Sequence, residues 1–216
     1  MLSPGFYLMD CMDGMKQFPD KFFDLAIVDP PYGINITSRK NGDRCQIGNG
    51  GKTYHAFDDS AIPGPEYFKE LFRVSKNQII WGGNYFTEHL PPTSCWICWD
   101  KARRDMDFAD GELAWTSFAK PMRIVSMKYG GNELNPKLKE ERIHPTQKPV
   151  RLYDYLLGRF AEPGDKILDT HVGSASSLIA CHRTKHPYWG FEIDPVFYKD
   201  ASERLENEKA QTSLFD

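Results

Sequence analysis

The fold of this chain is decided by Lys166-Ile167-Leu168-Asp169 and by the small-residue run Gly173-Ser174-Ala175-Ser176-Ser177 that follows it. The first segment predicts a short strand that ends on an acid. The second predicts a tight turn and a helix to about Arg183. A further strand is predicted at 188–191, with Glu192 at its end, and a further helix at 196–209. Because strands and helices alternate, the sequence predicts an α/β protein built on a parallel sheet.

The rest of the chain extends this pattern toward the N-terminus. Apolar runs predict strands at 6–9, 25–28, 78–81 and 94–99, and helices are predicted at 12–18, 65–74 and 150–160. Residues 112–118 and 123–129 are expected to form a strand pair. Residues 33–60 are polar and glycine-rich, so we expect a long loop without structure, of the kind that is functional or disordered.

Length and composition indicate one domain over residues 1–210, with a flexible tail at 211–216. The formal net charge of −3 means that any nucleic-acid surface must be local. Five cysteines without regular framing favour reduced thiols in a cytosol. No apolar stretch is long enough to span a membrane, and the N-terminus lacks the regions of a signal peptide. Cys95 and Cys98 have CxxC spacing, but there is no second pair and a strand would point the two thiols to opposite sides, so no metal site is predicted.

The tetrapeptide Asp29-Pro30-Pro31-Tyr32 directly follows the apolar run 24–28. It therefore lies just past the carboxyl end of a strand, where α/β proteins place their ligands. Two prolines fix φ and remove backbone donors, which leaves nearby carbonyls free to accept. A carboxylate and a carbonyl beside an aromatic ring suit a flat group that bears an amine. The alternative is an ordinary proline turn.

Two further segments have the composition of ligand sites. The turn at 173–177 lets a ligand approach the backbone at the start of a helix, and Glu192 ends the next strand, where doubly wound folds bind ribose hydroxyls. The alternative for this turn is a structural βα connection. The other segment is His144-Pro145-Thr146-Gln147-Lys148-Pro149, for which the alternative is a rigid proline-bracketed linker.

Together these segments resemble the motifs of amino-DNA methyltransferases that use S-adenosylmethionine (SAM). Asp29–Tyr32 matches the catalytic tetrapeptide, 144–149 matches the segment before the cofactor-binding half, and 169–176 resembles the Asp-Pro-Phe-x-Gly-x-Gly cofactor loop. Thr170 and His171 replace its Pro and Phe, and Ser or Ala replaces its later Gly. The motif order resembles the permuted beta group. The resemblance implies a Rossmann-like fold with helices on both faces of a mostly parallel sheet, and a cytoplasmic enzyme of bacterial or phage origin.

The resemblance also implies a mechanism and roles for single residues. Asp29 and the Pro30 carbonyl would accept hydrogen bonds from the target amine, and Tyr32 would stack on a base flipped out of the duplex, without a metal or a covalent intermediate. The implied catalytic set is Asp29, Pro30, Pro31 and Tyr32. Asp in the first position resembles N6-adenine enzymes, whereas N4-cytosine members more often carry Ser. The alternatives are an N4-cytosine enzyme and a catalytically degenerate DNA-binding homologue.

For the cofactor, the resemblance places Asp169 and Gly173 near its methionine part and Glu192 at its ribose. Lys148, with His144 or Thr146, would meet its carboxylate. Asp10 could accept from its adenine amine, the alternative being a helix cap. The full set of expected cofactor-binding residues is Asp10, Asp29, His144, Thr146, Lys148, Asp169, Thr170, Gly173, Ser174 and Glu192.

The expected macromolecular partner is double-stranded DNA, with a small recognition insert within about 101–143 and a contribution from 33–60. The candidate phosphate contacts are Arg39, Lys40, Arg44, Lys101, Arg103, Arg104, Lys137 and Lys139. Their alternative is a solvated charged face. Asn84 or Tyr85 is expected to line the base pocket, the alternative being a simple turn. A homodimer is possible for this family. The segment 211–215 resembles the Gln-x-x-Leu-Phe peptide that docks on sliding clamps, and its alternative is a frayed terminus.

Overall fold

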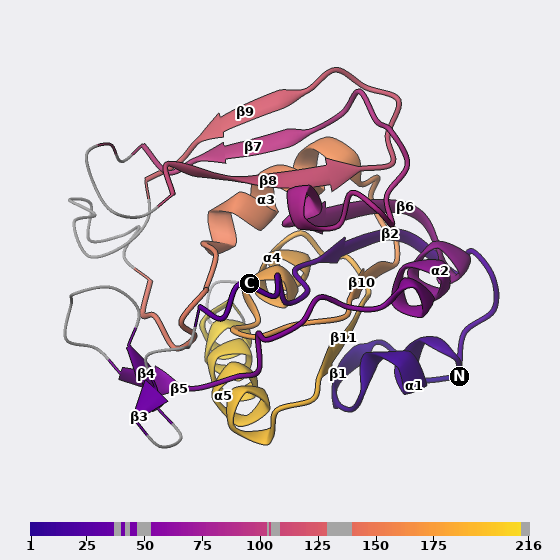
Figure 1. Ribbon diagram of the computed structural model, residues 1–216. Helices are drawn as coiled ribbons and strands as arrows, with labels where there is room; N and C mark the ends of the chain where they lie inside the picture. The colour runs from indigo at the N-terminus through magenta and orange to yellow at the C-terminus, as the bar shows by residue number, and fades with distance from the viewer. Residues whose placement is uncertain are drawn as a thin grey trace.

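The computed structural model describes residues 1–36, 40–41, 44–46, 53–102, 104, 109–128 and 140–212. Its centre is an eight-stranded sheet in the order β1-β11-β10-β2-β6-β8-β7-β9 (Figure 1). In that order the strands are β1 (Gly5–Leu8), β11 (Tyr188–Glu192), β10 (Ile167–Asp169), β2 (Phe23–Val28), β6 (Ser75–Trp81), β8 (Gly111–Thr116), β7 (Ile97–Asp100) and β9 (Arg123–Ser126).

The strands of this sheet are mostly parallel. Neighbours from β1 through β6 all pair in parallel, and β7 pairs in parallel with β9. Within the eight-stranded sheet, β8 is the strand that runs the other way, because it is antiparallel to both β6 and β7. The predicted α/β fold with a mostly parallel sheet is confirmed.

Helices cover both faces of the sheet (Figure 1). Side chains of α3, α4 and α5 pack with one face, and side chains of α1 and α2 pack with the other. The helices are α1 (Cys11–Met15), α2 (Pro65–Val74), α3 (Val150–Phe160), α4 (Ser176–Arg183) and α5 (Pro195–Thr212), with a 3₁₀ turn η1 (Gly83–Tyr85) after β6. None of these helices, within the residues that the structure describes, is both long and apolar enough to cross a membrane.

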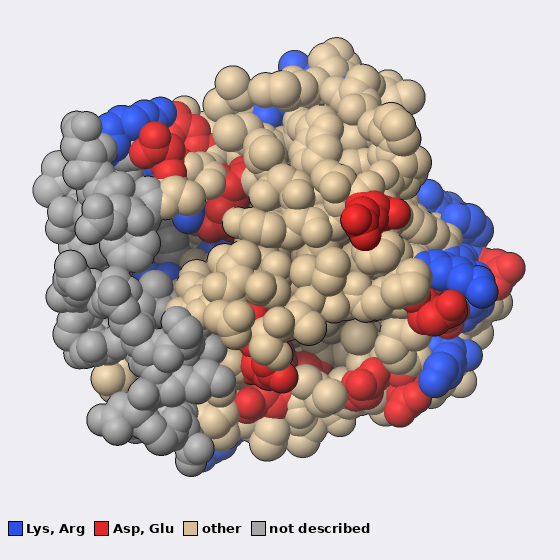
Figure 2. All heavy atoms as spheres, in the orientation of Figure 1, with Lys and Arg blue, Asp and Glu red and all other residues tan. Residues whose placement is uncertain are grey.

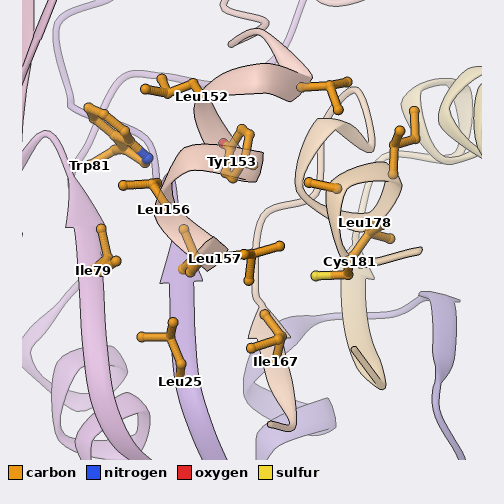
Figure 3. Packing of buried hydrophobic residues seen from close by; sticks show 14 of the residues in the cluster. Leu25, Ile79, Trp81, Leu152, Tyr153, Leu156, Leu157, Ile167, Leu178 and Cys181 are labelled. Carbon is orange, nitrogen blue, oxygen red and sulfur yellow. The ribbon is translucent and has the colours of Figure 1, made fainter. Parts of the chain in front are cut away.

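The apolar run of β2 is buried on both faces, which is typical of a central parallel strand. Leu25 and Ile27 belong to the core under α3, whereas Ala26 and Val28 belong to the core on the opposite face. Figure 3 shows Leu25, Ile79 and Ile167 on three strands of the sheet, beneath Leu156 and Leu157 of α3. Burial on both faces fixes the position of β2 and therefore the position of Asp29, which follows its last residue.

The expected pairing of 112–118 with 123–129 is wrong. β7 lies between β8 and β9, and Ile97 of β7 is the register partner of Arg123. Both edges of β8 are already paired, with β6 on one side and β7 on the other. The following strand, β9, therefore joins the side of β7 that β8 leaves free.

Residues 33–60 were expected to be a loop without structure, and this is also wrong for the described part. A small antiparallel sheet forms from β3 (Lys40–Asn41), β4 (Arg44–Gln46) and β5 (Thr53–His55). His55 pairs with Asp194 just before α5, with 2.9 Å between Nε2 and Oδ2, and Phe57 packs against Phe197. These contacts give the small sheet a fixed place beside the start of α5.

Residues 111–116 and 123–126 of the predicted recognition insert are strands of the central sheet. The role of the remainder of 101–143 in DNA recognition stays a prediction. The other predicted elements are present with shifted ends. The first helix, expected at 12–18, ends at Met15, and the strand expected at 94–99 spans Ile97–Asp100.

Candidate active site

Four acidic residues lie at the side of the central sheet where its parallel strands have their carboxyl ends. Parallel strands place their carboxyl ends at the same edge, and β1, β11, β10 and β2 are consecutive neighbours there. Asp10 follows β1, Glu192 ends β11, Asp169 ends β10, and Asp29 follows β2. Pairing of β10 with β2 thus brings the predicted cofactor loop beside the predicted catalytic tetrapeptide, although 140 positions separate Asp29 from Asp169 in the sequence (169 − 29).

Asp29 is held by two side chains. Its Oδ1 accepts a hydrogen bond from the Tyr32 hydroxyl at 2.6 Å, and its Oδ2 lies 2.5 Å from Lys148 Nζ. Burial raises the pKa of Asp29, and the positive charge of Lys148 opposes this rise. Each carboxylate oxygen has two lone pairs, so both retain capacity for a further donor.

Lys148 lies against the tetrapeptide. Its side chain is 3% exposed, and Nζ is 3.0 Å from Glu112 Oε2 and 3.2 Å from the Tyr32 hydroxyl. Burial alone would lower the pKa of Lys148, but the carboxylates of Asp29 and Glu112 raise it above its ordinary value. The expected contact of Lys148 with a cofactor carboxylate stays a prediction.

The ring of Tyr32 is fixed from two sides. It stacks on Tyr85, with centroids 5.1 Å apart and an interplanar angle of 17°. Gly82 has φ +70, and a Cβ there would lie 2.2 Å from the Tyr32 ring, so both backbone conformation and space require glycine. Tyr85 therefore lies beside the tetrapeptide, and both Asn84 and Tyr85 are exposed. Their role in lining a base pocket stays a prediction.

Asp59 is a site residue that the sequence did not reveal. It is 4% exposed, and its Oδ1 accepts from the backbone N–H groups of Tyr32 and Gly33, each at 2.9 Å. Its Oδ2 accepts from the N–H of Ile36 at 3.1 Å. The carboxylate thus fixes the backbone that leaves the tetrapeptide. No local sequence pattern predicts this contact, because it joins residues 27 positions apart.

The predicted cofactor loop forms a tight turn between β10 and α4. Gly173 has φ +55 and Ala175 has φ +60, so both adopt the left-handed conformation. Ala175 therefore builds the turn at the position where the family has its later glycine. Arg204 of α5 donates to the carbonyl of Ser174 at 2.7 Å and to the hydroxyl of Ser176 at 2.9 Å, which ties the turn to α5.

The residues that replace Pro and Phe in this loop have specific partners. The Thr170 hydroxyl is 2.7 Å from the hydroxyl of Tyr67 in α2, and the His171 ring packs edge-on against Tyr67. Burial lowers the pKa of His171 to about 4, so its ring is neutral at pH 7. The departures from the family pattern therefore pack against α2 and leave the turn intact.

Both acids beside this turn accept backbone hydrogen bonds. Asp169 accepts from the His171 N–H at 3.0 Å and from the Ser177 hydroxyl. Glu192 accepts from the N–H of Gly173 at 2.8 Å and from that of Asp194 at 3.0 Å. Burial raises the pKa of Asp169 to about 7, with smaller contributions from the negative charges of Asp29 and Glu192. Burial beside the turn thus favours the protonated form of Asp169 in the absence of a positive charge.

His144 is buried between the turn and the small sheet. Its ring centroid is 4.2 Å from that of Phe197 and 5.3 Å from that of Phe57, and its Nδ1 is 3.1 Å from the Thr146 hydroxyl. Burial lowers the pKa of His144 to about 3, so the ring is neutral. A Cβ on Gly173 would lie 3.7 Å from this ring, which places the predicted cofactor segments side by side.

Asp10 acts as the N-cap of α1 and accepts from the Met12 N–H at 2.7 Å. The structure thus shows the alternative role, a helix cap, and the contact of Asp10 with the cofactor stays a prediction. The cap uses one of its two carboxylate oxygens.

The expected DNA-contacting residues are only partly described. Lys101 pairs with Glu112 at 2.7 Å, and the exposed Arg104 pairs with Asp100 at 2.9 Å. The face shown in Figure 2 carries few charged side chains over β7, β8 and β9. Of the remaining candidates, Arg39, Arg103, Lys137 and Lys139, and the side chains of Lys40 and Arg44, lie outside the described residues.

Comparison with known proteins identifies the family. The profile of a DNA methylase family, N6_N4_Mtase, matches residues 88–203, which is more than half of the chain. The chain belongs to this DNA methylase family. The type II methyltransferase M.HpaI of Haemophilus parainfluenzae is 23% identical over 239 residues, covering 92% of this chain and 73% of the relative. The family resemblance drawn from the sequence is confirmed.

Solved structures of DNA methyltransferases share the fold. A complex of M1.HpyAVI with SAM has a TM-score of 0.57 and 19% identity, and the match covers 92% of this chain and 98% of that one. The cytosine-N4-specific PvuII methyltransferase has a TM-score of 0.60 and 14% identity, covering 96% and 92%. The DNA methylases that share this fold thus include a cytosine-specific enzyme.

Proposed function

We propose that this DNA methylase transfers a methyl group from SAM to the exocyclic N6 amine of a flipped-out adenine. The observation that carries the proposal is Asp29, a partly buried carboxylate fixed by Tyr32 and Lys148 after the carboxyl end of β2, beside the turn at 173–175. Methyl transfer to an amine requires two parts. One is a fixed acceptor for the amine, and the other is a turn that fits a nucleoside cofactor.

An exocyclic amine is a weak nucleophile, because its lone pair is delocalised into the ring. Asp29 and the Pro30 carbonyl would accept hydrogen bonds from its two N–H groups. These bonds would favour a pyramidal nitrogen and direct the lone pair out of the base plane. Tyr32 would support the base from its stacked position on Tyr85. SAM, when bound, would supply an electrophilic methyl on a sulfonium centre and would be left as the neutral thioether, while the methylated amine would lose one proton through its hydrogen bond to Asp29. The contribution of the protein is positioning and fixed charge.

The residues of the turn fit a cationic nucleoside cofactor. Glu192 would accept from the ribose hydroxyls, and the backbone at Gly173 and Ser174 would line the methionine part. Asp169 would face the positive charge of the cofactor, which would favour the ionised form of this buried carboxyl. His144 and Thr146, beside Gly173, complete the set together with Thr170 and Asp10. Because the turn is fully built, a catalytically degenerate homologue is the weaker alternative.

The choice of adenine over cytosine rests on Asp29, since the resemblance associates Asp at this position with N6-adenine enzymes. An N4-cytosine activity is the alternative, because the fold is shared with the cytosine-specific PvuII enzyme. Methylation of random-sequence DNA with labelled SAM, followed by mapping of the modified bases, distinguishes them. Label on cytosine N4 would overturn the adenine assignment.

The catalytic assignment is tested with Asp29→Ala. Loss of the acceptor should lower the methylation rate on the order of a hundredfold or more, and SAM binding in isothermal titration shows how much of the loss comes from the cofactor. Asp13→Asn is the matched control, because Asp13 is an exposed carboxylate on α1 that pairs with Lys16. A near-normal rate in Asp29→Ala would show that the reaction uses another group.

The proposed partner is double-stranded DNA, and a homodimer or a sliding-clamp contact through 211–215 are further proposals. Residues 213–216 lie outside the described part, and α5 extends to Thr212. Pull-down with a purified bacterial clamp should lose its signal when 211–216 are deleted. Capture that persists without these residues would dispose of the clamp contact.

A further inference from the structure

We propose that Glu112 is a positioning residue for methyl transfer, which holds Lys148 against Oδ2 of Asp29 and so keeps this carboxylate, whose Oδ1 is held by Tyr32, oriented toward the target amine. The inference rests on the proposed role of Asp29 as acceptor. Glu112 belongs to none of the three motifs that identify the family in this sequence.

The direction of β8 explains how Glu112 reaches the site. β8 is antiparallel to β6, so its first residues lie at the edge where β2 and β6 end. Glu112 is the second residue of β8, and its register partner is Trp99. A parallel strand in this place would bring its last residues to the edge instead. The reversed strand therefore places this carboxylate at the active edge.

Glu112 bridges two lysines. Its Oε2 lies 3.0 Å from Lys148 Nζ, and its Oε1 lies 2.7 Å from Lys101 Nζ. With Asp29, these residues form a charge-balanced group of two carboxylates and two ammonium groups. Removal of the Glu112 charge would leave this group with two ammonium groups and one carboxylate. Such an imbalance is costly inside a protein, and Lys148 relieves it by moving or by losing its proton.

The position of Lys148 decides how Asp29 can act. Nζ is within 3.2 Å of oxygens from Asp29, Tyr32 and Glu112, so it is held from three sides. It engages Oδ2 of Asp29, while Oδ1 accepts a hydrogen bond from the Tyr32 hydroxyl. A lysine held by Asp29 alone could rotate about that contact. The amine acceptor would then lose its fixed orientation, on which positional catalysis depends.

The groups that face Lys148 set its protonation. They are Asp29 and Tyr32 from the segment after β2, Glu112 from β8 with Lys101 behind it, and the neutral His144 from the segment before α3. Burial lowers the pKa of Lys148, whereas the two carboxylates raise it. The negative charge of Glu112 also raises the pKa of Asp29. Loss of the Glu112 charge should therefore lower the pKa values of both Lys148 and Asp29.

The test is Glu112→Gln in the full chain, because the amide keeps the shape and removes the charge. Single-turnover methylation of DNA should slow about tenfold or more. The basic limb of its pH profile should move down by about one unit or more, since Lys148 loses an anionic neighbour. Glu112→Asp restores the charge and should return the limb toward its original position. Glu66→Gln, an exposed carboxylate on α2, is the control.

A second measurement does not depend on activity. The ¹³Cε resonance of Lys148, assigned by comparison with Lys148→Arg, should titrate at lower pH in Glu112→Gln than in the wild-type protein. The proposal would be overturned if Glu112→Gln slowed the reaction but left both the pH profile and the titration of Lys148 unchanged. Glu112 would then have only a structural role. If the wild-type protein methylated no DNA, the proposed function would fail, and the lysine titration would still decide whether Glu112 controls Lys148.

Discussion

Asp59 shows how one buried side chain can hold an active-site backbone. Its carboxylate accepts from the N–H groups of Tyr32, Gly33 and Ile36. Asp59→Ala leaves these donors without their acceptor, and we expect the free energy of unfolding to fall by about 2 kcal/mol or more. The rate of methylation at saturating SAM should fall as well, because Tyr32 loses its fixed position. Urea unfolding and steady-state kinetics measure the two effects.

Asp58→Asn is the matched control for this prediction. Asp58 is the exposed neighbour, and one of its contacts is with the Ser60 N–H. Asp59→Asn should be intermediate, because its remaining carbonyl oxygen can still accept from Tyr32 and Gly33. Equal effects at positions 58 and 59 would contradict a specific role for Asp59.

Asp169 gives the stability of the protein a defined pH dependence. Its pKa is raised by burial to about 7, so the folded state favours the protonated acid. The stability that this preference supplies is present at low pH and is lost as the pH rises from about 4 to about 7. The loss proceeds at up to about 1.4 kcal/mol per pH unit.

Asp169→Asn should lack this loss, so its free energy of unfolding relative to wild type should rise between pH 5 and pH 8. The comparison must be a difference, because His144 and His171 have lowered pKa values and act in the opposite direction below about pH 6.5. Urea unfolding without cofactor at both pH values measures it. A difference that does not change with pH would show that Asp169 is ionised throughout.

At the scale of the element, the turn between β10 and α4 contains two left-handed residues, of which one is glycine. Gly173→Ala should cost about 1–2 kcal/mol, because a Cβ at φ +55 is strained although the space for it exists. Ala175→Gly should change stability by less than about 1 kcal/mol. It relieves a similar strain but removes a buried methyl group worth about 0.8 kcal/mol. Thermal unfolding of both variants tests this ranking, and equal losses would contradict it.

The strands show what a local pattern can predict and what it cannot. The segment 123–126 was correctly predicted as a strand, but its partner was not, because the pairing depends on which edge remains free after β8 is paired on both sides. The apolar run of β2 needed no such information, since its composition already required burial on both faces.

At the scale of the whole molecule, the proposed DNA contacts lie on the same side of the sheet as Asp29, where the parallel strands have their carboxyl ends. β7 runs parallel to β6, so Arg104, which follows β7, lies at this edge. Arg104→Gln should weaken DNA binding and reduce the slope of log K against log salt by about 1, if the guanidinium contacts a phosphate. Fluorescence anisotropy at several salt concentrations measures both quantities.

Arg159→Gln is the control for this prediction, because Arg159 lies in the last turn of α3, near the opposite edge where β10 begins. Its slope should equal that of the wild-type protein. Identical salt dependence for Arg104→Gln and the wild type would exclude Arg104 from the DNA surface.

The sequence by itself determined the α/β class, the three motifs and their order. These follow from apolar runs, small-residue turns and acids at strand ends, all of which act over a few neighbouring residues. Tertiary structure alone decided that Lys148 pairs with Asp29 and Glu112, that Asp59 holds the backbone of Tyr32, and that β9 joins β7. Those contacts join residues distant in the sequence, and they depend on the order and direction of strands in one sheet, which no local pattern encodes.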